Sequence, residues 1–116
     1  MPRDVRIYLE DIVTSIDRIR EYTRGVSLDG FLADTKTQDA VIRNLEIIGE
    51  AAKSALPLAK GDTQAANWRK IVEFRNVLAH EYFGVDLRIV WDVVENKLGP
   101  LREECGEMLA SLDSER

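Results

Sequence analysis

The chain has 116 residues, enough to bury one hydrophobic core, which predicts a single domain over residues 1–116. Hydrophobic residues make up 45% of the chain and charged residues 32%, and no run of about 18 apolar residues occurs, so the composition indicates a globular protein and excludes a membrane-spanning helix. The net charge of −5 excludes broad coating of nucleic acid, which depends on positive charge.

The charge is distributed unevenly along the chain. Residues 67–90 carry four basic and three acidic side chains, a balance of +1, so the remainder of the chain is at −6. A contact with a polyanion can therefore form locally in this segment, although the overall charge of the protein would not drive it.

The single cysteine, Cys105, cannot form an internal disulfide, which favours a reducing compartment. The N-terminal residues are polar and charged and contain no signal-peptide pattern, so we expect the protein in the cytoplasm. Nearby carboxylates would raise the pKa of the thiol, so we interpret Cys105 as a structural residue. These carboxylates belong to Glu103, Glu104 and Glu107.

The first third of the chain predicts one long helix and one short helical turn. Apolar residues recur every three or four positions over 5–22, a spacing typical of one helical face, and Gly25 ends the pattern. Residues 27–32 are too few for an independent helix and predict a connecting turn of helix.

A second long helix is expected to start after Thr35 or Thr37 and to close at Pro57 and Gly61. Small residues in its second half indicate a close approach to a neighbouring helix. They are Gly49, Ala51 and Ala52.

The second half of the chain predicts two further helices and a final amphipathic segment. Asn67 is expected to cap a third helix that runs to about His80. A fourth helix over 86–98 begins with a capping aspartate, and the Gly99-Pro100 pair should kink or break it before the segment 101–112.

No strand pattern accompanies these helices. The predicted fold class is therefore all-α, an antiparallel up-and-down bundle of four to five helices that is kinked near Gly99-Pro100. Trp68 and Trp91 are expected to anchor the core or a dimer interface.

Two charged pairs on the second long helix allow more than one interpretation. Glu46 and Glu50 lie one turn apart and form a weak candidate for a metal or acid site, because no second histidine or close aspartate accompanies them. Asp39 and Arg43 are also one turn apart and are expected to form a surface ion pair.

The polar residues best suited to catalysis lie in the segment 75–82. His80 is the only histidine, its ordinary pKa suits proton transfer near neutral pH, and the C-terminal end of a helix favours its charged form. Asn76 lies four residues earlier, on the same helical face. Arg75 can bend its long side chain toward that face, and Tyr82 follows just beyond the helix end.

This set suits the cleavage of RNA by its own 2′-hydroxyl, which needs proton transfers and a cation for the phosphate but no metal or cofactor. Arg75 can contact the phosphate with two N–H groups. One histidine does not readily supply both a general base and a general acid, so the sequence motivates a two-fold dimer with a composite site. The alternative is a histidine that only caps its helix.

Several groups of residues along the chain combine into a specific pattern. They are Thr37–Ala52, Trp68-Arg69-Lys70-Ile71, Arg75-Asn76-x3-His80-x-Tyr82-Phe83, Val85-Asp86, Trp91 and the opening helix with Tyr22. This pattern resembles the HepT-like HEPN-domain toxin family over about residues 4–112, nearly the whole chain.

The resemblance implies a ribonuclease toxin with tRNA as the expected substrate, a helical-bundle fold, and a homodimer, or a higher oligomer of it, that forms through the motif face. It implies a partner, the MntA-like nucleotidyltransferase antitoxin. By position, Arg75 and His80 match the catalytic pair, and Asn76 matches the polar residue beside the arginine. Tyr82 matches the tyrosine that the antitoxin modifies with AMP, which would place charge and bulk where the RNA phosphate sits.

A second function class stays open beside the enzyme. The same residues could form a non-catalytic module that binds a nucleotide or a nucleotidyltransferase without cleaving RNA. The acidic net charge favours this module, whereas the intact set of Arg75, Asn76 and His80 favours the enzyme.

Overall fold

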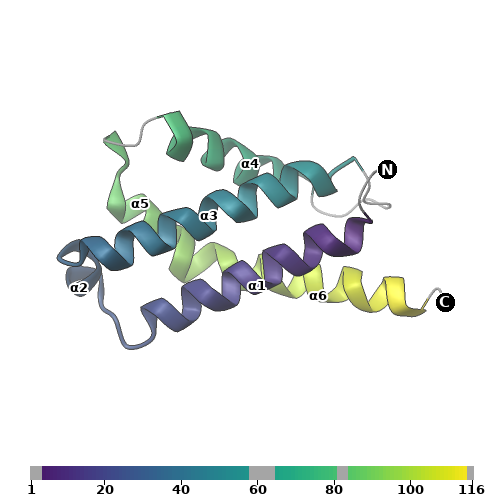
Figure 1. Ribbon diagram of the computed structural model, residues 1–116, viewed down its shortest axis with the longest axis horizontal. Coiled ribbons are helices and arrows are strands. Elements are labelled where there is room, and N and C mark those ends of the chain that lie inside the picture. The colour runs from purple at the N-terminus through teal and green to yellow at the C-terminus, as the bar shows by residue number, and fades with distance from the viewer. Residues whose placement is uncertain (1–3, 58–64, 81–83, 115–116) are drawn as a thin grey trace.

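The computed structural model describes residues 4–57, 65–80 and 84–114, and these residues contain helices and no strand. The long helices run alternately in opposite directions, which confirms the predicted all-α up-and-down bundle (Figure 1). Within the described residues, no helix is both long and apolar enough to cross a membrane. The elements in chain order are α1 (Val5–Thr23), α2 (Leu28–Leu32), α3 (Thr35–Ala55), α4 (Ala65–His80), α5 (Leu87–Asp92), η2 (Val93–Lys97) and α6 (Leu98–Ser114).

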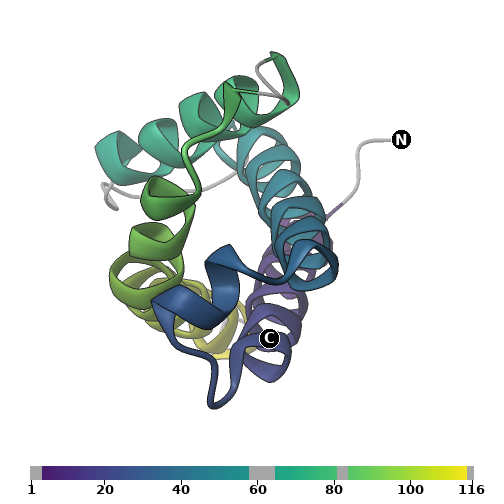
Figure 2. The same cartoon turned by 90° about the vertical axis from the view of Figure 1, so that its left-hand side faces the viewer.

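Side-chain caps define the starts of the first three helices. Asp4 accepts a hydrogen bond from the backbone N–H of Arg6 at 3.0 Å, and Ser27 accepts one from Gly30 at 3.1 Å. The short helix α2, predicted as a connecting turn, follows Gly25, whose φ of 73° favours glycine. It covers the end of the bundle where α1 leads into α3 (Figure 2).

The start of α3 is set by Asp34, which accepts hydrogen bonds from the N–H and the hydroxyl of Thr37 at 3.1 and 2.6 Å. The helix therefore begins at Thr35, slightly earlier than the predicted start after Thr35 or Thr37. It lies beside both α1 and α4 (Figure 1) and buries residues on both sides.

The core lies between α1, α3 and the α5–α6 region. Trp68 is 2% exposed and belongs to this core, as predicted. Trp91 is half-buried, and its ring centroid lies 5.1 Å from that of Phe31 in α2. The core side chains of α1 and α3 are Leu9, Ile12, Ile16, Ile19, Val41, Ile42, Leu45, Ile48, Ala51, Ala52 and Ala55.

The predicted cap at Asn67 is wrong, because α4 begins at Ala65 and Asn67 lies inside the helix. Ala65 and Ala66 have the highest intrinsic helix propensity, which accounts for the extension of the helix beyond the expected cap. The predicted end of the helix at about His80 is confirmed.

The predicted kink near Gly99-Pro100 is confirmed, and a π-helical segment precedes it. Pro100 has no N–H to donate to the carbonyl of Asn96, and its ring would collide with that carbonyl in a regular α-helix. The π-helix η2 contains Asn96, and the N–H of Leu98 donates to the carbonyl of Val93. The helical axis changes direction between α5 and α6 (Figures 1 and 2).

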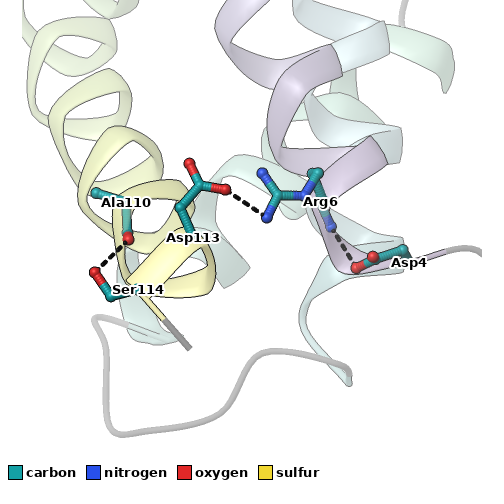
Figure 3. Close-up of polar contacts among 5 residues, drawn as sticks. All are labelled: Asp4, Arg6, Ala110, Asp113 and Ser114. Atoms are coloured by element: carbon teal, nitrogen blue, oxygen red, sulfur yellow. Dashed lines mark hydrogen bonds and ion pairs between the residues drawn. The ribbon is translucent and has the colours of Figure 1, made fainter. Parts of the chain in front are cut away.

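Ion pairs join α1 to α6 along their length. Arg102 donates two hydrogen bonds to Asp17, at 2.7 and 3.0 Å. Nearer the chain ends, the guanidinium of Arg6 lies 2.8 Å from the carboxylate of Asp113 (Figure 3). The two contacts join the helices near the two ends of α6.

Candidate active site

The predicted site residues Arg75 and Asn76 are in contact on α4. The Nη1 atom of Arg75 donates a hydrogen bond to Oδ1 of Asn76 at 3.3 Å. The Asn76 side chain is exposed, whereas that of Arg75 is 31% exposed. The pair therefore lies at the surface, where a large ligand can reach it.

A carboxylate from α3 also contacts Arg75. The Oε2 atom of Glu50 lies 3.1 Å from the Nη2 atom of Arg75. The sequence pattern does not link these residues, because they are 25 positions apart and on different helices. The one signal for their proximity is Gly49, whose small size indicated a close helix approach.

That close approach is confirmed at Gly49. A Cβ atom added at Gly49 would lie 2.2 Å from the Cβ of Arg75 and 2.7 Å from its Cγ. Real Cβ atoms do not approach so closely, so any larger residue at this position would push α4 away from α3. Gly49 thus sets the position of the backbone that carries Arg75.

A hollow of about 440 Å³ lies beside this contact, between α1, α3 and α4. Arg75 forms part of its wall. Two guanidinium groups and three carboxylates line it, a balance of −1, so the hollow by itself does not favour phosphate. These charged side chains belong to Asp11, Arg43, Glu46, Glu50 and Arg75.

Ion pairs account for the two glutamates that were candidates for a metal or acid site. Glu50 contacts Arg75, and Glu46 lies 3.9 Å from Arg43. In the described ranges, no group of three or more His, Cys, Asp or Glu side chains could hold a metal ion. The predicted partner of Arg43 is wrong, since Arg43 pairs with Glu46 and not with Asp39. Residues three positions apart on a helix can pair as well as residues four apart, and Glu46 lies three positions after Arg43.

His80 and Tyr82 complete the predicted site. Helix α4 ends at His80, which puts this residue one helical turn beyond Asn76 at the predicted helix end. The side chain of His80, and Tyr82 as a whole, lie outside the described residues. The roles assigned to both remain predictions.

Cys105 is buried in α6, and burial, with a smaller contribution from Glu104, raises the pKa of its thiol to about 12. The thiolate form is therefore negligible at neutral pH. The interpretation of Cys105 as a structural residue is confirmed.

The chain is similar to known proteins over most of its length. Residues 12–108 match the protein family described as ribonuclease HepT-like. The chain is 44% identical over 102 residues to a Thermococcus cleftensis protein named "Probable ribonuclease HepT", covering 88% of this chain and 93% of that protein. It is 38% identical over 116 residues to a candidate RNase of Methanocaldococcus jannaschii, covering 99% of this chain and 96% of that protein.

A third relative is longer than this chain. It is a Methanocaldococcus jannaschii protein whose name combines a gamma-glutamylcyclotransferase with a candidate RNase. The identity is 40% over 116 residues, which cover 100% of this chain but 52% of that protein. No solved structure matches the chain. The family match and the relatives together show that this chain belongs to the HepT-like ribonuclease family.

Proposed function

We propose that this protein is a metal-independent endoribonuclease whose catalytic residues are Arg75, Asn76 and His80. The observation that carries the proposal is the contact between the Arg75 guanidinium and the exposed Asn76 amide, in the turn of α4 that leads to His80. Membership of the HepT-like ribonuclease family supports the same assignment.

The proposed reaction is an attack of the ribose 2′-hydroxyl on the adjacent phosphorus. A general base takes the 2′-hydroxyl proton, the O2′–P bond forms, and the P–O5′ bond breaks. The products are a 2′,3′-cyclic phosphate and a 5′-hydroxyl, whose proton comes from a general acid. Arg75 stabilises the charge that gathers on the phosphate oxygens, and Asn76 orients the phosphate or the imidazole.

The two proton transfers require two groups, and the chain has one histidine. We therefore infer that a homodimer forms a composite cleft with His80 and Arg75 from each subunit.

The proposed substrate is tRNA, met in the cytoplasm, and the proposed partner is an MntA-like nucleotidyltransferase antitoxin. AMP addition to Tyr82 would silence the toxin, because the new phosphate would compete with RNA for the cation at Arg75. The resemblance of the segment 75–83 to the toxin motif supports these assignments.

A non-catalytic binding module is the second candidate. The observation that favours it is the acidic balance of the hollow beside Arg75, together with the net charge of −5. Such a module would bind a nucleotide or a nucleotidyltransferase through the same residues and leave RNA intact.

The experiment that separates the two is incubation with tRNA in excess chelator. We expect cleavage by the wild-type protein and loss of about 100-fold or more in His80→Ala, because proton transfer contributes at least that much. Arg24→Ala is the matched control, because it removes an equal charge from an exposed arginine outside the residues of the family pattern, and it should cleave normally. Equal cleavage by the wild-type protein and by His80→Ala would contradict the proposed ribonuclease function. The proposal would also be contradicted if the wild-type protein cleaved no tRNA although mass spectrometry showed that its Tyr82 is unmodified.

A further inference from the structure

Glu50 is the residue of α3 that reaches the proposed catalytic arginine. Its carboxylate lies 3.1 Å from Nη2 of Arg75, although its side chain is 57% exposed and could extend into solvent. An exposed ion pair of this kind contributes little to stability, because solvent screens it and both side chains lose rotational freedom. Because stability does not account for the contact, we looked for its role in the proposed active site.

The guanidinium of Arg75 is held from two sides. Glu50 contacts Nη2, and Asn76 accepts a hydrogen bond from Nη1. An arginine has five N–H donors, so these two contacts leave three donors for a phosphate. Gly49, next to Glu50, fixes the distance between the two helices at this point. These two contacts therefore define the orientation of the guanidinium in this structure.

We propose that Glu50 is a positioning residue for Arg75, which holds the guanidinium in the orientation that meets the RNA phosphate. The inference rests on the proposed ribonuclease function and adds to it a residue from α3. Glu50 has a second, opposing effect, because its negative charge lies near the phosphate that Arg75 binds. Positioning raises the rate of the chemical step, whereas the negative charge weakens RNA binding.

These two effects predict a specific kinetic signature for Glu50→Ala. The freed guanidinium should stabilise the transition state less well, since small misplacements of catalytic groups cost large factors in rate, and we expect kcat to fall about tenfold. KM should stay unchanged or fall, because a carboxylate has been removed from the RNA-binding surface. Glu50→Gln keeps an oxygen that can accept from Nη2, so it should recover part of the lost kcat.

Glu46→Ala is the matched control. Glu46 lies one turn earlier on α3, lines the same hollow and pairs with Arg43 at 3.9 Å. Its removal changes the local charge by the same amount without removing the contact with Arg75. We expect kcat to stay near the wild-type value. A rise in kcat in Glu50→Ala would overturn the inference, since it would mean that Glu50 masks Arg75. Equal kcat in both variants and wild type would overturn it too.

A second readout does not depend on RNA cleavage. Nitrogen-15 NMR detects hindered rotation of a guanidinium as separate Nη–H signals, and Arg75→Lys identifies those of Arg75. We expect these signals in wild type and Glu46→Ala and their collapse in Glu50→Ala. Signals that persist in Glu50→Ala would overturn the inference whether or not the protein cleaves RNA. If wild type cleaves no tRNA, the proposed function fails, and the NMR result still decides whether Glu50 holds Arg75.

Discussion

Helices α3 and α4 lie side by side but serve different purposes (Figure 1). α3 packs against α1 on one side and against α4 on the other, and its inner residues are among the most buried of the chain. α4 buries Trp68 and Leu78, whereas Asn76 and Val77 stay exposed. The difference teaches that α3 supports the fold from both sides, whereas α4 exposes polar residues of the proposed site.

The strongest test of this division compares a buried residue of α3 with an exposed residue of α4. Ile48→Ala removes a buried side chain that α3 packs into the core, and should lower the free energy of unfolding by about 2–5 kcal/mol. Val77→Ala trims an exposed side chain of α4 and should lower it by about 0.5 kcal/mol or less. Urea denaturation measures both. Similar losses in the free energy of unfolding in the two variants would contradict this division between the helices.

A smaller effect is expected at the contact between the two helices. Gly49→Ala forces a Cβ into Arg75 and should destabilise the protein by about 1–3 kcal/mol, as overpacking does. It should also reduce RNA cleavage, because it displaces the arginine. The free energy of unfolding and the cleavage rate are measured on the same sample.

Gly106→Ala is the control for that substitution. Gly106 is exposed on α6 with nothing within 4 Å of an added Cβ, so alanine should stabilise its helix by up to about 1 kcal/mol. Destabilisation at Gly106 and not at Gly49 would contradict the close approach of α3 and α4.

The smallest effect is expected at the surface, between Asp17 and Arg102. The hydrogen bonds from Arg102 lower the pKa of the Asp17 carboxyl below its ordinary value of 3.8. A lowered pKa in the folded state contributes stability above the ordinary pKa, and that stability is lost as the pH falls through the lowered value. Because both groups are exposed, the contribution should be below about 1 kcal/mol.

Unfolding of wild type and Arg102→Ala between pH 2 and pH 6 measures this contribution as the difference between two curves. The difference should shrink toward the acidic end, where Asp17 becomes protonated. A difference that grows as the pH falls would contradict the role of the ion pair.

Local patterns predicted most of the fold. The three- and four-residue spacing of apolar side chains predicted α1, and start and stop signals predicted α3. Asp86 was predicted as the cap of α5, where it accepts from the N–H of Arg88 at 2.9 Å. The start of α4 was misplaced because a cap signal at Asn67 competed with the helix propensity of two alanines. The π-helix before Pro100 has no sequence signal besides the proline itself.

The site was predicted only in part. Arg75 and Asn76 are neighbours in sequence, so their contact follows from local geometry. The contact between Glu50 and Arg75 joins two helices, and its existence depends on the angle and separation of α3 and α4. Sequence spacing along one helix cannot supply those quantities. Gly49 indicates that the helices meet, but not which side chains meet beside it.

The most direct test of the proposed chemistry is the identity of the RNA ends. Cleavage of a synthetic RNA in excess chelator should yield a 2′,3′-cyclic phosphate and a 5′-hydroxyl, detected by mass spectrometry. The yield should fall about 100-fold or more in Arg75→Ala, which removes the cation at the phosphate, and stay unchanged in Arg24→Ala. Products with a 5′-phosphate, or cleavage that requires a divalent ion, would contradict metal-independent attack by the 2′-hydroxyl at the outer face of α4.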